Sequence, residues 1–140
     1  MTTELLAPAG GREALVAAVQ SGADAVYMGF GAFNARRSAR NFSDEEFRAA
    51  VSYCHLRGVK VYLTLNTLVT DRELPALADA ARVASECGVD AILVQDWGVL
   101  ATLQKIIPDV PLHASTQMSL HTLSGVKESA RLGMTRAVLA

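Results

Sequence analysis

The sequence is poor in cysteine and has no excess of charge of either sign. Cys54 and Cys87 are its only cysteines, and their spacing fits neither a disulfide framework nor a CxxC metal site. We therefore expect two reduced, buried thiols. The 13 basic and 14 acidic residues give a formal net charge of -1. This balance argues against a surface built throughout for nucleic acid and leaves only local basic patches.

Long apolar runs are also missing. No run approaches the roughly 18 residues that a membrane-spanning helix needs. The opening residues, MTTELLAPAGG, lack the basic start and apolar stretch of a secretory signal peptide. We therefore expect a cytoplasmic protein with no membrane partner. With 51% hydrophobic and 19% charged residues, the chain can bury one core, as a single domain or as part of a larger one.

The chain does have short apolar runs that alternate with helical patterns. The runs, predicted as buried strands, span residues 4–8, 24–29, 60–66, 90–95, 111–115 and 136–140. The helical patterns between them span residues 11–22, 43–58, 71–88, 97–108 and 119–133. Four of the five patterns end at a glycine, at positions 22, 58, 88 and 133, as helices often do. Strands and helices that alternate with short turns predict parallel strands joined by right-handed crossovers.

The two faces of the predicted strands favour a barrel over a doubly wound sheet. In the third strand, Val61 and Leu63 lie on an aliphatic face, while Tyr62 and Thr64 lie on a larger, partly polar face. An aliphatic face suits a coat of helices, and the other face suits a barrel interior. No GxGxxG or GxxxxGK[ST] motif follows the first strand. We therefore expect an α/β, TIM-barrel-like fold of about six parallel strands and five helices. A complete TIM barrel has eight strands and only about six are predicted here. Residues 1–140 are therefore predicted to form the N-terminal part of a single truncated catalytic domain.

Chemistry is expected at the carboxyl ends of the strands, where parallel barrels build their sites. The loop GFGAFNARRSARNF, residues 29–42, carries three arginines and no acidic residue. Its arginines could bind phosphate or carboxylate groups, although a solvated basic loop would have the same composition. The predicted substrate-binding residues are Asn34, Arg36, Arg40, Asn66, Gln95 and Gln117. The candidates for catalysis are Asp96, His113 and Ser115, and no metal-ligating set is predicted. The expected partner is an anionic substrate, either a peptide or an RNA.

Several of these segments resemble a known family. ELLAPAGGREAL, GADAVYMGFGAFNARRSARNF, VYLTLNTLV, LVQDWGVL and HASTQMSLHT look like the N-terminal region of peptidase family U32, the collagenase-like proteases. The resemblance implies a TIM-barrel-like catalytic domain and a peptidase, that is, a hydrolase. It also implies an alternative, because some members act in hydroxylating ribosomal or transfer RNA, or ubiquinone, with an iron–sulfur cluster. The family's cysteine signature lies downstream of this chain, so no cofactor is placed here and a cluster is expected only in a full-length protein.

The residues themselves give little support to proteolysis. No HExxH motif is present, and Cys54 and His55 diverge by about 100° on a helix. His113 and Ser115 share a strand face but lie about 6.5–7 Å apart along the strand, beyond direct hydrogen bonding unless a water or a bend intervenes. Two other interpretations remain open. One is a TIM-barrel lyase or aldolase that acts on an anionic substrate. Its only plausible Schiff-base lysine would be Lys60, which lies near the start of its strand and therefore at the wrong end of the barrel. The other is a non-catalytic fragment or scaffold.

Two further expectations concern packing. Glu4 and Lys60 begin the first and third strands on the inward face, so we expect them to form a buried ion pair, with two solvent-facing charges as the alternative. The outer edges of the first and last strands would lack partners. We therefore expect self-association through the open barrel edges, most simply as a two-fold dimer that buries more than about 1,000 Å².

Overall fold

A computed structural model describes residues 3–35 and 42–140 of the chain. Its sheet has six parallel strands in sequential order, each hydrogen-bonded to the next. The strands are β1 (Leu6–Pro8), β2 (Ala25–Gly29), β3 (Lys60–Leu65), β4 (Ala91–Val94), β5 (Leu112–Ala114) and β6 (Arg136–Ala137). Each falls within a predicted apolar run. The last is shorter than expected, because only two residues of 136–140 pair as a strand.

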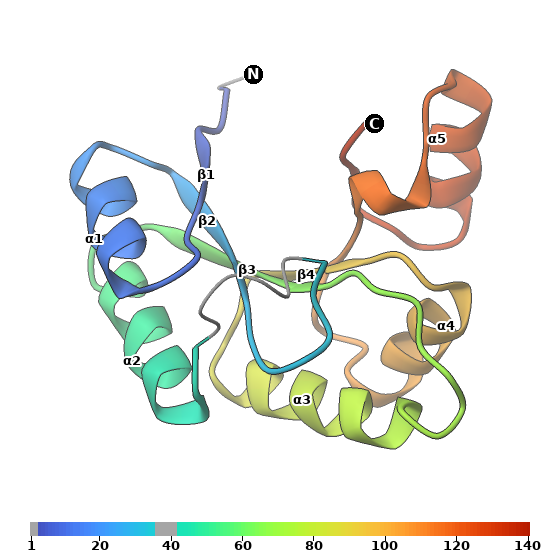
Figure 1. Cartoon of the computed structure of the whole chain (residues 1–140). Helices are drawn as coiled ribbons and strands as arrows, with labels where there is room; N and C mark the ends of the chain where they lie inside the picture. Colours follow the sequence, from blue (N-terminus) through green and yellow to red (C-terminus); the bar gives the residue numbers. More distant parts are fainter. Residues whose placement is uncertain (1–2, 36–41) are drawn as a thin grey trace.

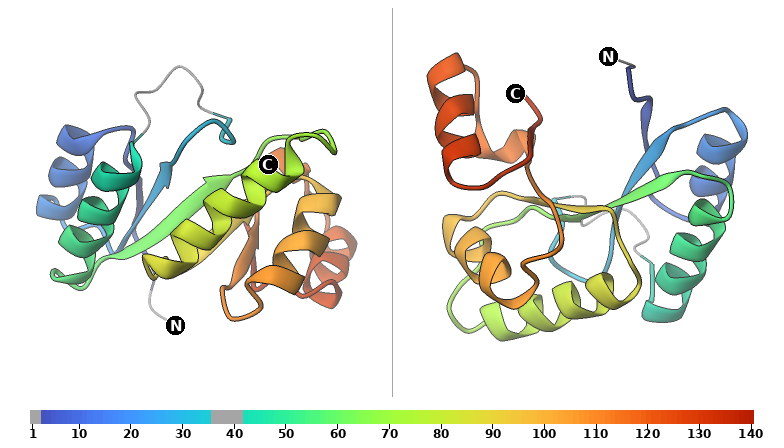
Figure 2. Two further views of the ribbon diagram at one scale, coloured as in Figure 1. Left: turned by 90° about the horizontal axis from the view of Figure 1, so that it is seen from below. Right: turned by 180° about the vertical axis from the view of Figure 1, so that it is seen from behind.

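Five helices connect the strands. They are α1 (Arg12–Gln20), α2 (Asp44–His55), α3 (Leu74–Glu86), α4 (Trp97–Ile106) and α5 (Leu123–Arg131), with a short 3₁₀ turn, η1 (Thr116–Met118), after β5. The sheet curves into an arc with the helices on its outer side, and the described chain begins and ends at the open side of the arc (Figure 1). The other two views show the same arrangement (Figure 2). The fold is therefore half of a TIM-like barrel, as predicted, and not a doubly wound sheet. Across the described residues, no helix has the length and apolar character required to cross a membrane.

The two faces of the sheet form two separate apolar clusters. Val61 and Leu63 of β3 belong to the large cluster between the sheet and the helices. Tyr62 belongs to a smaller cluster on the concave face, with Ala25, Ala91 and Leu93. Residues of β3 thus alternate between the two clusters, because successive side chains of a strand point to opposite faces. The predicted sidedness is confirmed.

Local signals define the helix ends. Ser43 and Glu46 form a complete capping box at the start of α2, where the Ser43 side chain accepts a hydrogen bond from the Glu46 N–H and the Glu46 carboxylate accepts one from the Ser43 N–H. The glycines predicted to end four helices all have positive φ, between 70° and 91°. A residue with a side chain is strained in this conformation, so glycine lets the chain turn into the next strand.

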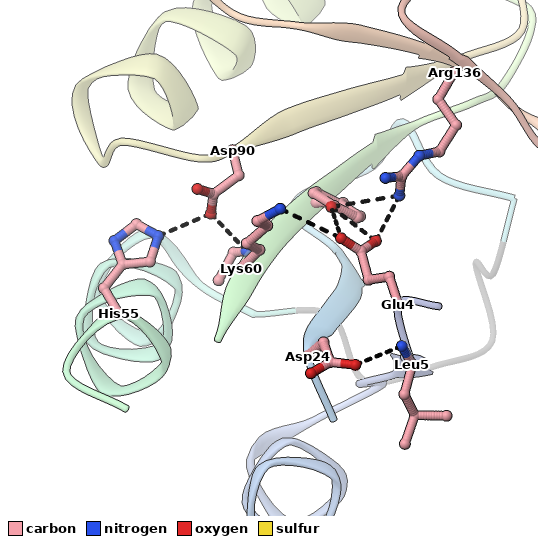
Figure 3. Close-up of polar contacts among 9 residues, drawn as sticks. Glu4, Leu5, Asp24, His55, Lys60, Asp90 and Arg136 are labelled. Atoms are coloured by element: carbon pink, nitrogen blue, oxygen red, sulfur yellow. Dashed lines mark hydrogen bonds and ion pairs between the residues drawn. The ribbon is translucent and has the colours of Figure 1, made fainter. Parts of the chain in front are cut away.

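Two aspartates fix where neighbouring strands begin. Asp24 precedes β2 and accepts a hydrogen bond from the backbone N–H of Leu5 at 2.7 Å. Asp90 precedes β4 and accepts one from the N–H of Val61 at 2.7 Å, while it also pairs with His55 of α2 at 2.9 Å (Figure 3). Each carboxylate therefore satisfies a backbone donor of the preceding strand, at the end of the barrel opposite the expected site.

Candidate binding site at the barrel mouth

A cavity of about 360 Å³ opens at the carboxyl ends of the strands. Its polar lining consists of neutral amides and hydroxyls from Asn34, Thr64, Asn66, Ser115, Thr116 and Gln117, and its larger apolar and aromatic lining comes from Leu6, Met28, Tyr27, Leu93 and Val138. No charged side chain lines it in the described part of the chain. The volume is within the range of small-molecule sites. The cavity is suited to a largely neutral group that offers both hydrogen-bond donors and acceptors.

Asn66 ties three strand ends together at this cavity. It follows β3, and its Nδ2 donates to Ser115 Oγ after β5 at 3.0 Å. Its Oδ1 accepts from the backbone N–H of Ala35, in the segment after β2, at 3.1 Å. Both ends of this amide are therefore used to hold other parts of the mouth in place. We infer that Asn66 contributes to the shape of the cavity as well as to its lining.

Asn34 is packed directly on the backbone of β2. Its side chain is 1% exposed, and its Nδ2 donates to the carbonyl of Gly31 at 3.4 Å. A Cβ atom on Gly29 would lie only 2.6 Å from the Asn34 amide. Gly29 is therefore needed because Asn34 approaches the strand closely at the cavity wall. Asn34 was predicted from the sequence but Gly29 was not, since nothing in the local pattern shows which side chain packs on that glycine.

The structure brings together four of the residues predicted from the sequence and leaves three others apart. Asn34, Asn66, Ser115 and Gln117 line one cavity. Gln95 and His113 do not line it, and neither does Asp96. Asp96 caps α4, since its carboxylate accepts hydrogen bonds from the N–H groups of Gly98 and Val99. Arg36 and Arg40 lie outside the described residues. The roles of these residues in binding stay predictions.

His113 lies inside the half-barrel as a buried neutral base. It is 6% exposed, and its ring packs edge-on against Tyr62 with ring centres 5.0 Å apart. Burial lowers the pKa of His113 to about 4, and the positive charge of Arg136 acts in the same direction. No hydrogen bond joins His113 to Ser115 among the described residues, so these two side chains do not form a nucleophile–base pair in this structure.

A charged cluster forms the inner floor of the half-barrel, on the side away from the cavity. Glu4 accepts hydrogen bonds from Tyr62 at 2.9 Å, from Lys60 at 3.4 Å and from Arg136 of β6 (Figure 3). The hydrogen bond from Arg136 holds the pKa of Glu4 below its ordinary value. Burial raises the pKa of Tyr62, and its bond to the Glu4 carboxylate raises it further. The cluster joins the first strand region to the last one across the open side of the sheet.

The expected pair of Glu4 and Lys60 therefore exists, but it is not buried. The Lys60 side chain is 56% exposed and that of Glu4 is 20% exposed. The long lysine side chain extends to solvent at the bottom of the half-barrel. Arg136, which was not predicted, is a second cation for Glu4. Its position at the start of the sixth strand, on the same inward face as Lys60, was the available signal.

The two cysteines lie on the outer layer of the fold. Cys54 is buried in α2, and burial raises its pKa to about 11. Cys87 directly follows α3. Among the described residues, no group of three or more histidine, cysteine, aspartate or glutamate side chains could hold a metal ion. Iron–sulfur clusters are usually held by four cysteine thiolates, so the residues present do not fit such a cluster.

The fold and the mouth cavity define a barrel-type protein with a candidate site at the carboxyl ends of its parallel strands. Residues 10–140 match the profile described as peptidase family U32, and the chain belongs to this family. Among solved structures, the U32 peptidase Mk0906 superposes with a TM-score of 0.75 at 19% identity, covering 99% of this chain and 58% of that one. Phosphonopyruvate hydrolase gives a TM-score of 0.65 at 19% identity, covering 98% and 53%. These similarities show the fold.

Curated relatives carry two kinds of name. The chain is 41% identical to the 23S rRNA 5-hydroxycytidine C2501 synthase of Escherichia coli (strain K12), over 98% of this chain and 20% of that protein. It is 36% identical to the tRNA hydroxylation protein P1 of Bacillus subtilis (strain 168), over 98% and 32%. It is 33% identical to a collagenase of Porphyromonas gingivalis (strain ATCC BAA-308 / W83), over 91% and 31%. The chain thus spans between a fifth and a third of the length of these relatives.

Proposed function

We propose that this chain forms the base-binding mouth of an enzyme that hydroxylates a pyrimidine base of RNA. Relatives named for hydroxylation of ribosomal and transfer RNA match 98% of the chain at 36–41% identity. Hydroxylation replaces a C–H bond with C–OH, a two-electron oxidation that requires an oxygen donor and an electron acceptor. The described residues hold neither, so the part assigned to this chain is to bind and orient the base. A cluster held by cysteines outside the chain belongs to the same proposal.

The observation that carries this proposal is the neutral polar lining of the mouth cavity. A pyrimidine base is planar and uncharged, and its edge presents both donors and acceptors. Amides and hydroxyls such as those of Asn34, Asn66 and Ser115 can pair with such an edge, and an aromatic side chain such as Tyr27 can contact its face. The anionic partner expected from the sequence is then the RNA backbone. Arg36 and Arg40 are proposed as its phosphate ligands, as their position in the loop after β2 suggests.

Peptide hydrolysis is the second candidate, because the family bears the peptidase name and one relative is named a collagenase. The described residues give it less support. The hydroxyl of Ser115 is hydrogen-bonded to Asn66 rather than to His113, and a serine nucleophile needs an adjacent general base.

One experiment separates the two candidates. The full-length protein is expressed in an Escherichia coli strain that lacks its own 23S rRNA 5-hydroxycytidine synthase. The nucleosides of ribosomal and transfer RNA are then analysed by mass spectrometry. We expect a pyrimidine nucleoside with one added oxygen atom, and we expect it to be lost with Asn66→Leu. The exposed-site variant Ser52→Ala is the matched control and should retain it. If the RNA stays unmodified and the purified protein cleaves gelatin, the hydroxylation proposal is wrong and peptide hydrolysis is supported.

A further inference from the structure

The hydroxyl of Ser115 is held in one orientation at the wall of the mouth cavity. Ser115 is 2% exposed and lines the cavity. Its Oγ accepts a hydrogen bond from Asn66 Nδ2 at 3.0 Å and a longer one from the backbone N–H of Gln117 at 3.3 Å. A hydroxyl oxygen has two lone pairs and one hydrogen. Both lone pairs are therefore engaged, and only the hydrogen is left to interact with a ligand.

The elements around Ser115 make this arrangement rigid. Its backbone N–H donates to the carbonyl of Val94 in β4, and its side chain caps the 3₁₀ turn η1. Asn66 is itself anchored, because its Oδ1 accepts from the N–H of Ala35. The Asn66 amide therefore cannot rotate to offer Ser115 its oxygen without breaking that second bond. The amide thus determines that Ser115 receives a hydrogen bond from Asn66 and does not give one.

We propose that Ser115 is a hydrogen-bond donor that recognises a carbonyl oxygen of the bound ligand. Its hydrogen has no acceptor among the residues that the structure describes, and a buried donor without an acceptor is unfavourable. A ligand oxygen in the cavity would supply the acceptor. This assignment rests on the proposed function: because a 41% identical relative is named for 5-hydroxycytidine, we assign this oxygen to the single exocyclic carbonyl of a cytosine base. Asn66 is then the positioning residue that keeps the serine hydrogen available.

A role for Ser115 as a hydrogen-bond donor is different from a role as a nucleophile, and the structure favours the first. Ser115 would need a free lone pair to attack a substrate carbon, and a base to take its proton. Here the lone pairs point to Asn66 and Gln117. A site that offers only a donor discriminates against a ligand whose matching atom is a poor acceptor, because the donor is then left unpaired. Ser115 is therefore expected to determine specificity.

The test compares two RNA probes that differ in one atom. In both, adenosines flank a single pyrimidine, which is cytidine in one probe and 2-thiocytidine in the other, where a weakly accepting sulfur replaces the carbonyl oxygen. Binding of each probe to the full-length protein is measured by fluorescence anisotropy, with an all-adenosine RNA as the baseline. The wild-type protein should bind the cytidine probe about 3–10-fold more tightly than the thio probe, as expected for one hydrogen bond.

Two variants should abolish this preference by different routes. Ser115→Ala removes the donor. Asn66→Asp keeps an acceptor for the Ala35 N–H but attracts the Ser115 hydrogen to its own carboxylate, so the serine no longer donates to the ligand. Ser115→Thr should keep the preference, and so should the exposed control Ser52→Ala. Because Asn66→Asp leaves Ser115 in place and opens no space for sulfur, it distinguishes hydrogen bonding from a steric effect, and it carries the test if a Ser115 variant does not fold.

The possible outcomes separate this inference from the function on which it rests. A wild-type preference for cytidine that falls to about one in both Ser115→Ala and Asn66→Asp supports it. Tighter binding of the cytidine probe than of the all-adenosine RNA, but with equal binding of the thio probe or a preference that survives in Ser115→Ala, overturns the role of Ser115 and leaves the proposed function standing. Binding of the cytidine probe no tighter than that of the all-adenosine RNA overturns both.

Discussion

Replacing His113 should remove a pH-dependent loss of stability. Its pKa in the folded chain is about 4, against an ordinary value of 6.5, chiefly because the ring is buried and also because Arg136 and Lys60 place positive charge nearby. The unfolded chain therefore binds more protons than the folded chain between these two pH values, and stability falls as the pH falls through this window. At about 1.36 kcal/mol per pH unit, the full effect is about 3 kcal/mol.

The pH range in which His113 affects stability can be separated from the ranges in which its neighbouring groups do so. Tyr62 touches its ring, and Glu4 lies in the same cluster. Because the pKa of Glu4 is lowered from 4.5 by its hydrogen bond to Arg136, Glu4 loses stabilising charge only below about pH 4.5. Above that pH the histidine dominates this cluster. We expect about 2.4 kcal/mol of the His113 effect to appear between about pH 7 and about pH 4.5.

The measurement is urea unfolding followed by far-ultraviolet circular dichroism, at one protein concentration and a series of pH values. His113→Phe and His113→Leu should each become more stable relative to the wild type as the pH falls, by about 2.4 kcal/mol in the window. Their different packing costs at neutral pH do not matter, because only the change with pH is compared. If the difference in free energy of unfolding between the wild type and both variants stays constant from about pH 7 to about pH 4.5, the inference that His113 is buried as a neutral ring is wrong.

Three further outcomes are expected. Gly29→Ala should displace the amide of Asn34 and destabilise the chain by about 1–3 kcal/mol, whereas Gly11→Ala, whose added Cβ meets no atom within 4 Å, should have little effect in the same unfolding assay; equal effects would contradict the close packing. Lys60→Met should cost less than about 1 kcal/mol because its side chain is exposed, and Arg136→Met should cost more in the same titrations; the reverse order would show that the lysine is the main partner in the floor cluster. The 140-residue chain should form a dimer as its concentration rises, because the outer edges of the first and last strands have no partner strand among the described residues; light scattering that gives a monomer mass at every micromolar concentration would exclude this association.

Local patterns predicted most of the fold. The glycines at the helix ends and the alternating faces of β3 depend on residues only a few positions apart, so the sequence alone reveals them. The length of β6 was overestimated, because pairing with β5 ends after two residues and apolar composition alone does not reveal where pairing stops. Part of the cavity lining was also predictable, since strand-end positions identified Asn34, Asn66, Ser115 and Gln117.

The sequence by itself determined the order of strands and helices, the side of the sheet that the helices cover, and the end of the strands where a site would form. These features follow from spacing along the chain. Only the tertiary structure decided which side chains meet. Asn66 bonds Ser115 from 49 residues away, and Arg136 reaches Glu4 from 132 residues away. Such contacts depend on the curvature of the sheet and on which rotamers fit inside it, and no periodicity records either of them.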